Sequence, residues 1–496
     1  MFPLALARFG YRPQNDEHKK LGEVWEDSAV NKSIIGASAA SVLVVGYVGA
    51  SWALGRAVHS GFDTWEQEVA RQPLAIAKVA ERKYTPGVFS SVEEVTFELN
   101  GAFFDQLKKS RRPEQQQSDD EASPPMRFTL RNDVKHGPFP SFTGVGTARI
   151  DTKFVWSKEV RAKLDEFLPG REPVEISTLL GLLGGASSHV TSPAFDFKDE
   201  KTALGWQGFV GDFSVGRNMG SIGCAATSPG FSVTGADGVS VKVETLKLTC
   251  DGERVFDALY DGTVNFEIAA LETSAKGVET PMRLQKLSYS SDVRADGQYV
   301  DMVMKLGIGT LHWFQNEISD ATYHVSLHHL HGPTYGAWTR KMQNAWLSSI
   351  SDPTALRGLD GAFAELLPQL LEHSPQLVID HIGFTAPEGE FGIKGTAELP
   401  GFHKDDLATP QSRAALMGKI VANADVWISE ALLNKDWSGP TEKAEVSNEG
   451  PGQAEAMRRQ VAAFEQQGFV TRKDGQLHTH IEFKGGALTA NGKPLR

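Results

Sequence analysis

The sequence contains little cysteine and no excess of positive charge. Two of its 496 residues are cysteine, which excludes a disulfide-dense scaffold, a zinc ribbon and most iron–sulfur sites. Acidic residues outnumber basic ones by 62 to 50, and this net charge of −12 argues against a nucleic-acid-binding protein. The chain also lacks a Gly-x-Ser-x-Gly elbow, a Walker loop, a dinucleotide fingerprint and a His-Glu-x-x-His motif. The sequence therefore predicts no catalytic residue, metal or cofactor.

One uncharged run stands out near the N-terminus. Residues 33–55 carry no charge, and about 20 helical residues cross the roughly 30 Å of a bilayer core. We expect a transmembrane anchor in the lipid bilayer. A buried soluble helix and a cleaved signal peptide are the alternatives, although the apolar region of a signal peptide is normally only ~7–15 residues. Small residues in this run would let two anchors pack closely in a homodimer: Gly36, Ala40, Gly46 and Ala50.

The charges around this run predict its orientation. Lys19, Lys20 and Lys32 precede it, whereas Arg56 and Arg71 follow it. Because positive residues stay on the cytoplasmic side, residues 1–32 are predicted to be a cytoplasmic tail and residues 56–496 an exported domain. Both cysteines, Cys224 and Cys250, lie in that domain on predicted strands. They form either a disulfide in an oxidising compartment or two buried free thiols.

Alternation of apolar and polar residues dominates between residues 88 and 311. Period two predicts half-buried strands, and Asp-Gly pairs at 237, 251, 261 and 296 predict hairpin turns between them. The apolar phase switches between Val92 and Val95, at Leu246 and at Leu287, which predicts bulges and a curved sheet. The expected fold class is α+β and β-rich: a large curved, mostly antiparallel sheet of bulged amphipathic strands with several packed helices, preceded by one transmembrane helix.

Helices are predicted mainly in the last third of the chain. Apolar stripes at helical spacing cover residues 338–350, 356–370 and 454–466, while residues 416–433 fit a helix and a strand equally well. Residues 477–495 are predicted to form a final hairpin. A sub-boundary is expected near residue 332, and the low-complexity stretch 108–125 is expected to be a mobile hairpin tip.

Three stretches resemble the YdgA-like family of bacterial envelope proteins. They are residues 82–91, residues 134–140 with the sequence Val-Lys-His-Gly-Pro-Phe-Pro, and residues 477–495. The resemblance implies a periplasmic protein tethered to the inner membrane by one N-terminal helix. It also favours a strand at 416–428, followed by a helix. The family supplies no catalytic residues and no assigned molecular function.

The motif at residues 136–140 has two interpretations. His136 ends a predicted strand, and Pro138 and Pro140 lack the backbone donors that a ladder needs, so the motif terminates a strand rigidly. Alternatively, Phe139 is held between the two stiff prolines, after an extended Gly137, and the motif is a docking point for a ligand or partner. Both interpretations remain open.

Histidine-rich segments are the nearest approach to a metal site. His324, His328, His329 and His331 alternate between two strand faces, whereas His478, His480 and Glu482 share one face. A closed zinc site needs three or four converging ligands, so wet strand faces are the preferred interpretation of both segments.

Three hypotheses about function follow. The first is a non-enzymatic scaffold or assembly protein of the cell envelope, and the second is a protein that binds or transfers a lipid or another apolar ligand. The third is a hydrolase with an unrecognised site. A groove left open by the helices would favour lipid binding, whereas a filled core would favour the scaffold.

Overall fold

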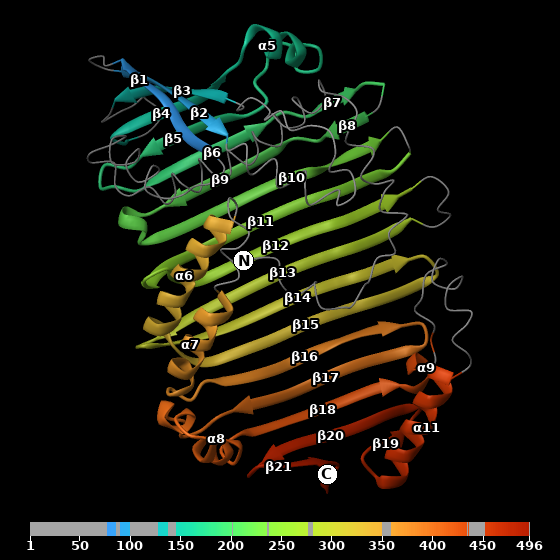
Figure 1. Cartoon of the computed structure of the whole chain (residues 1–496). Coiled ribbons are helices and arrows are strands. Elements are labelled where there is room, and N and C mark those ends of the chain that lie inside the picture. Colours follow the sequence, from blue (N-terminus) through green and yellow to red (C-terminus); the bar gives the residue numbers. More distant parts are fainter. Residues whose placement is uncertain are drawn as a thin grey trace, which may run out of the picture.

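The computed structural model describes residues 77–85, 90–99, 127–136, 145–200, 202–235, 238–275, 281–349, 359–433, 435 and 452–495. These residues form one large, open antiparallel sheet of 22 strands with a few helices, so the predicted β-rich class is confirmed (Figure 1). The predicted anchor (33–55) and the predicted mobile tip (108–125) lie outside the described residues. No helix within the described ranges is long and apolar enough to cross a membrane.

The strands of the N-terminal part are short, and those of the central part are long. The short strands are β1 (Ala77–Thr85), β2 (Ser90–Leu99), β3 (Arg127–His136), β4 (Ala148–Val155), β5 (Glu175–Leu180), β6 (Ala186–Ser192), β7 (Phe195–Lys198), β8 (Thr202–Trp206) and β9 (Phe209–Val215). The long strands are β10 (Ser221–Gly235), β11 (Ser240–Phe256), β12 (Leu259–Ser274), β13 (Met282–Asp296), β14 (Tyr299–Trp313) and β15 (Asn316–His331).

The last third combines strands with helices. The strands are β16 (Gln376–Ala386), β17 (Gly389–Glu398), β18 (Val421–Ser429), β19 (Thr471–Lys473), β20 (Gln476–Lys484), β21 (Ala487–Ala490) and β22 (Lys493–Pro494). The helices are α5 (Lys158–Asp165) in the N-terminal half, then α6 (Gly332–Ser349), α7 (Leu359–Leu371), α8 (Pro410–Met417), α9 (Glu430–Leu433) and α11 (Gly452–Gln467). Short 3₁₀ turns lie at Arg217–Met219 and Lys404–Leu407.

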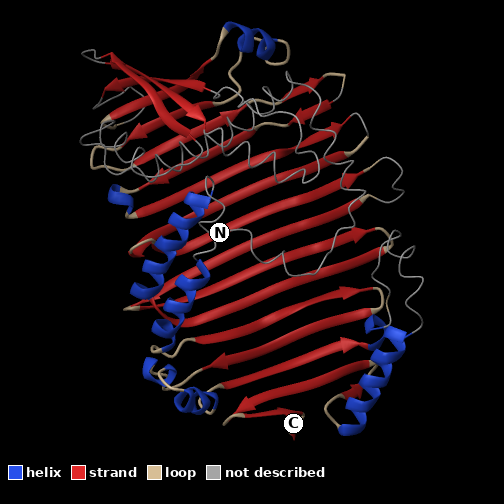
Figure 2. Cartoon of the chain, viewed as in Figure 1, coloured by secondary structure: helices blue, strands red, loops and turns tan. Residues whose placement is uncertain are grey.

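Neighbouring strands follow the chain almost in order. From β9 through β10 to β18 each strand pairs antiparallel with the next, and β18 then pairs with β20. The N-terminal half of β10 pairs with β9 and its C-terminal half pairs with β8. Figure 2 shows the result as a long ladder, with α6 and α7 against one side and α11 near the C-terminal end. Most contacts are therefore between consecutive strands.

Buried apolar residues of the described part of the chain gather in three clusters. One cluster joins β2–β6 through Val95, Phe97 and Leu130, and a small one beside it contains Val134 and Ile150. A separate cluster lies where β12–β15 meet α6. The described residues thus have separate buried cores in the N-terminal strands and where the central strands meet α6.

Two of the predicted turns are wrong. Asp251-Gly252 lies inside β11 and Asp261-Gly262 lies inside β12, where the two glycines face each other across the ladder. Gly262 has φ +155°, and a Cβ there would collide with the backbone of Asp251, so the glycine permits a close approach of two strands. The chain turns instead at Asp257, which has φ +40°. The predicted turn at Asp296-Gly297 is confirmed.

The phase switch predicted between Val92 and Val95 is also wrong. Strand β2 keeps a single phase, and Glu93 takes an inward position with 0% exposure. It accepts hydrogen bonds from Arg82 Nε at 2.7 Å and Asn132 Nδ2 at 2.9 Å, and Thr152 donates to Asn132 Oδ1. Hydrophobic patterning predicts an apolar side chain at this inward position. The structure has a hydrogen-bonded polar network there instead.

The other element predictions are confirmed. Helices occur at the three predicted stripes, as α6, α7 and α11, and the final hairpin is formed by β20 and β21. The ambiguous stretch at 416–433 forms strand β18 followed by helix α9, as the family resemblance implied.

Candidate ligand-binding face

Two rows of mostly apolar side chains cross nine strands of the sheet. Directly paired residues of an antiparallel ladder point to the same face, so the register defines each row. Row 1 contains Leu246, Ile268, Leu287, Ile308, Ala321, Phe384, Phe391, Ile428 and Leu477; Phe384 lies opposite the bulge at Asp320 and Ala321. Row 2 contains Leu248, Phe266, Tyr289, Leu306, Tyr323, Ile382, Ile393, Val426 and Thr479. Members of the two rows are two residues apart in each strand and share one face.

A third row follows beyond a line of irregular backbone. Thr245, Lys286 and Asp320 have φ of +42°, +54° and +49° in alternate strands β11, β13 and β15, at the same level of the ladder. From β11 to β15 the register is the same on both sides of this line, which we call the crease, so it is not a series of inserted residues within these strands. In β11, Val243 is buried and Leu246 is half-buried, although residues three apart on a regular strand would point to opposite faces. The residues outside this pair, Lys242 and Lys247, are both exposed. The alternation of buried and exposed residues therefore reverses at the crease.

The crease explains the phase switches predicted at Leu246 and Leu287. Both switches exist, but a positive φ absorbs each of them instead of an extra residue. Beyond the crease lies row 3: Val243, Leu271, Leu284, Leu311 and Ile318. The reversal keeps apolar side chains on one face on both sides of the line, and three parallel apolar rows result.

These rows are only partly covered. Among the described residues of rows 1 and 2, Leu477 is the one buried member, and Tyr323 is 42% exposed. Side chains of these types are usually buried in a globular core. The face is therefore a wide apolar surface with incomplete cover from the described part of the chain.

Helices α6 and α7 cover one end of this face (Figure 1). Tyr335 of α6 packs into the cluster of Val300 and Met302, and its hydroxyl donates to the Met302 sulfur at 3.8 Å. Burial raises the pKa of Tyr335 to about 12, with a further contribution from Tyr289 of row 2. Trp338 of α6 contacts Phe363 of α7 edge-on. The two helices thus lie beside row 2 near one end of the long strands.

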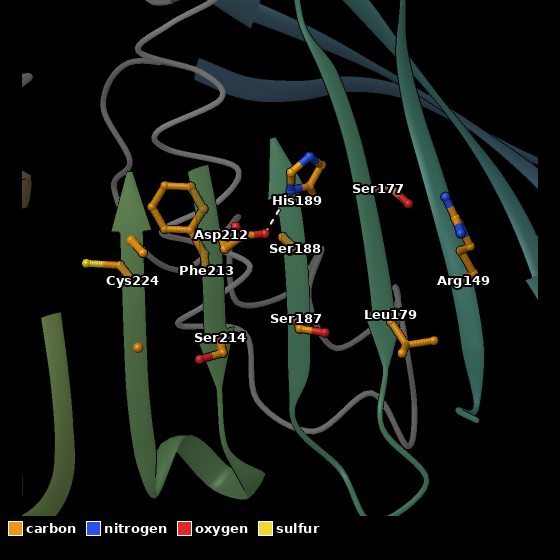
Figure 3. A pocket seen from close by; sticks show the side chains of 12 residues that line it. Arg149, Ser177, Leu179, Ser187, Ser188, His189, Asp212, Phe213, Ser214 and Cys224 are labelled. Atoms are coloured by element: carbon orange, nitrogen blue, oxygen red, sulfur yellow. Dashed lines mark hydrogen bonds and ion pairs between the residues drawn. The ribbon is translucent and has the colours of Figure 1, made fainter. Parts of the chain in front are cut away.

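A cavity of about 520 Å³ lies over β4, β5, β6, β9 and β10 (Figure 3). Its lining includes Arg149, Ser177, Ser187, Ser214 and the hydrogen-bonded pair His189–Asp212, with 2.7 Å between Nδ1 and Oδ1. The Ser188 hydroxyl bonds to Thr178 at 2.8 Å. The described contacts thus pair the histidine with a carboxylate and this serine with a threonine, and they do not assemble a serine–histidine–aspartate relay.

Asp151 lies beside this lining. Burial alone raises the pKa of this carboxyl, but hydrogen bonds from Ser177, Arg149 and Lys135 outweigh that effect and lower it below its usual value. The carboxylate is therefore held ionised in a local network of charges.

The histidine-rich segments do not converge on one point. His324 pairs with Asp380, His328 pairs with Asp301, and His329 bonds to the backbone carbonyl of His373. His480 pairs with Asp425. Within the ranges the structure describes, there is no group of three or more potential metal ligands.

The two cysteines lie directly opposite each other. Cys224 of β10 pairs with Cys250 of β11, their Cα atoms are 4.8 Å apart, and the structure joins their sulfur atoms in a disulfide. Both cysteines thus lie on strands, as the sequence predicted. Formation of this disulfide in the cell stays a prediction, because it needs an oxidising compartment.

Only the first residue of the predicted docking motif is described. His136 ends β3, and its Nε2 lies 3.1 Å from the Ser91 hydroxyl of β2. Gly137, Pro138, Phe139 and Pro140 lie outside the described residues. The geometry of the motif as a docking point therefore stays a prediction.

The structure thus places the protein in a class that is built on one long, open antiparallel sheet with a partly covered apolar face. The chain belongs to the DUF945 family, described as "Bacterial protein of unknown function", whose family model matches residues 30–496. It is similar to Protein YdgA of Escherichia coli (strain K12), with 20% identity over 499 residues that cover 94% of this chain and 95% of that protein. The resemblance seen in the sequence is thus confirmed. No solved structure matches the chain.

Proposed function

We propose that this protein is a non-enzymatic envelope protein that holds the acyl chain of a membrane lipid on its apolar face. The observation that carries the proposal is the pair of rows 1 and 2, in which every position but Thr479 is apolar or aromatic. Exposed apolar patches of this extent normally mark an interaction site, because contact with water is unfavourable.

The shape of the surface fits a linear hydrocarbon chain. Nine strands have eight spacings of about 4.8 Å, so each row is roughly 38 Å long, which exceeds the roughly 30 Å of a bilayer core. The rows carry no Asp, Glu, Lys, Arg or His side chain, and this matches an uncharged chain. An acyl chain would lie across the strands, parallel to the crease, in contact with one side chain from each strand.

The proposed location supplies such a ligand. An anchor at 33–55 in the inner membrane, with the tail 1–32 in the cytoplasm and residues 56–496 in the periplasm, would hold the sheet next to membrane lipids. The periplasm is oxidising, and the apposed Cys224 and Cys250 suit that compartment.

Neighbouring residues on β14 provide a matched test. Leu306 belongs to row 2, whereas Lys305 is exposed on the opposite face. We expect Leu306→Asn to weaken binding of a fluorescent phospholipid by about 2 kcal/mol, or roughly 30-fold, because a polar group replaces about three buried carbon atoms. Lys305→Asn places the same residue on the polar face and should leave affinity within about twofold. Equal effects of the two substitutions would contradict the proposal.

A scaffold role is the second candidate, and one observation favours it. Helices α6 and α7 expose Trp346, Phe363 and Leu367, with exposed fractions of 54%, 47% and 40%. Apolar side chains on the outside of a helical pair suit a protein partner or a second copy of this chain. Loss of a cross-linked partner on Trp346→Ser, with lipid binding unchanged, would support this role. An unchanged cross-linking pattern would count against it.

A further inference from the structure

The helical segment between β15 and β16 is closed at its base by two histidines. His331 is the last residue of β15, directly before α6, and His373 follows α7, just before β16. Their rings stack with centroids 3.9 Å apart and planes at 9°. The point where the chain leaves the sheet is thus joined to the point where it returns.

Neighbouring groups surround this stack. Tyr299 of β14 meets both rings edge-on, at 6.2 and 6.1 Å, and itself stacks on His329. His329 Nδ1 lies 2.8 Å from the His373 carbonyl oxygen, and His331 Nδ1 lies 2.7 Å from the Thr334 hydroxyl of α6. These contacts fix the rings from β14, β15 and α6.

The charged groups nearby are engaged elsewhere. Asp301 of β14 pairs with His328 and accepts the backbone N–H of His329. Glu372, next to His373, accepts the backbone N–H of Lys404. On α6, Arg340 pairs with Asp257 of the β11–β12 turn. In these contacts each carboxylate has a partner other than the two stacked rings.

We propose that the His331–His373 stack is a pH-sensitive clasp that holds α6 and α7 against the apolar face and releases them when the rings are protonated. Two neutral rings stack favourably, whereas two imidazolium charges at 3.9 Å repel each other. The inference concerns regulation of the proposed lipid site and rests on that function for its purpose. Release of the helices would uncover the apolar cluster of Val300 and Met302 beside row 2.

The direction of the pH effect follows from the burial of His331. Burial, with a further contribution from His373, lowers the pKa of His331 below its usual value of 6.5. The neutral ring is therefore favoured in the folded state. The clasp is complete above pH 6.5 and weakens as the pH falls below that value.

Hydrogen exchange of the full-length protein at pH 7.5 and 5.5, without added lipid, tests the clasp. After correction for intrinsic exchange rates, α6 and α7 of the wild type should exchange roughly two- to tenfold faster at pH 5.5, while β11–β14 stay protected. The double variant His331→Phe and His373→Phe keeps a stack that cannot be protonated and should lose this pH dependence. His189→Phe, which removes an exposed pair elsewhere, should behave as the wild type does.

Three results would overturn the clasp. They are wild-type helices that stay equally protected at both pH values, a double variant that retains the full pH response, and a His189→Phe protein that loses it. If the double variant does not fold, His331→Asn alone should reduce the response, because an amide can still bond to Thr334 without gaining a charge. Since no lipid is present, failure of the lipid proposal would leave these outcomes unchanged.

Discussion

Glu93 gives the clearest test of how the N-terminal end of the sheet is held together. Its carboxylate has 0% exposure and accepts hydrogen bonds from Arg82 and Asn132. Glu93→Ala would leave the guanidinium of Arg82, itself only 15% exposed, without this partner in a poorly solvated site. Removing one member of a buried ion pair costs about 3–5 kcal/mol.

The adjacent residue is a matched control for this prediction. Glu94 points to the other face, is 36% exposed, and lies 3.6 Å from Arg131. Exposed pairs of this kind contribute about 0–1 kcal/mol, so Glu94→Ala should have little effect. Native-state hydrogen exchange of β1–β4 measures the local free energy of opening directly, which suits a long sheet whose unfolding need not be two-state. Equal costs for the two substitutions would refute the network as a source of stability.

Three further predictions concern stability. Gly336→Ala should destabilise the protein by about 1–3 kcal/mol in urea titrations, because the new Cβ would lie 2.7 Å from the Phe256 carbonyl oxygen. This cost should exceed the gain from the better helix propensity of alanine, and an unchanged unfolding midpoint would contradict this packing. Replacing both Cys224 and Cys250 by serine should lower the free energy of unfolding by about 3 kcal/mol relative to the oxidised protein. Relative to the reduced protein the free energy of unfolding should not change, and urea unfolding with and without reductant measures both differences. Asp151→Asn should cost about 1 kcal/mol at pH 7, and this difference should shrink as the pH falls below 3.8, the usual carboxyl pKa, since a carboxylate with a lowered pKa loses its stabilising contribution as it is protonated. A difference that is independent of pH would show that the charge is not involved.

The sequence predicted strands and helices where one physical signal dominated. Trp338 and Met342 lie on one helical stripe, and α6 forms there; period two in the central region predicted the long strands. The sequence did not predict where the chain turns, because Asp-Gly pairs serve two purposes. Gly252 and Gly262 allow close approach inside a ladder, and only the register of the two strands distinguishes this use from a turn.

The candidate site was predicted only in part. Phase switches at Leu246 and Leu287 were visible, but their alignment across neighbouring strands into one crease requires the pairing of residues far apart in sequence. Glu93 was missed because hydrophobic patterning treats every carboxylate as exposed. The stack of His331 on His373 was also missed, since two helices separate the residues in the chain.

The claim that the apolar face holds a lipid can be tested most directly by native mass spectrometry. Residues 60–496 would be purified from a bacterial periplasm without detergent, and the bound material would be extracted and identified. We predict a stoichiometric lipid in the wild type and its loss in Leu306→Asn but not in Lys305→Asn. A lipid-free mass that persists after addition of envelope lipids would contradict the account.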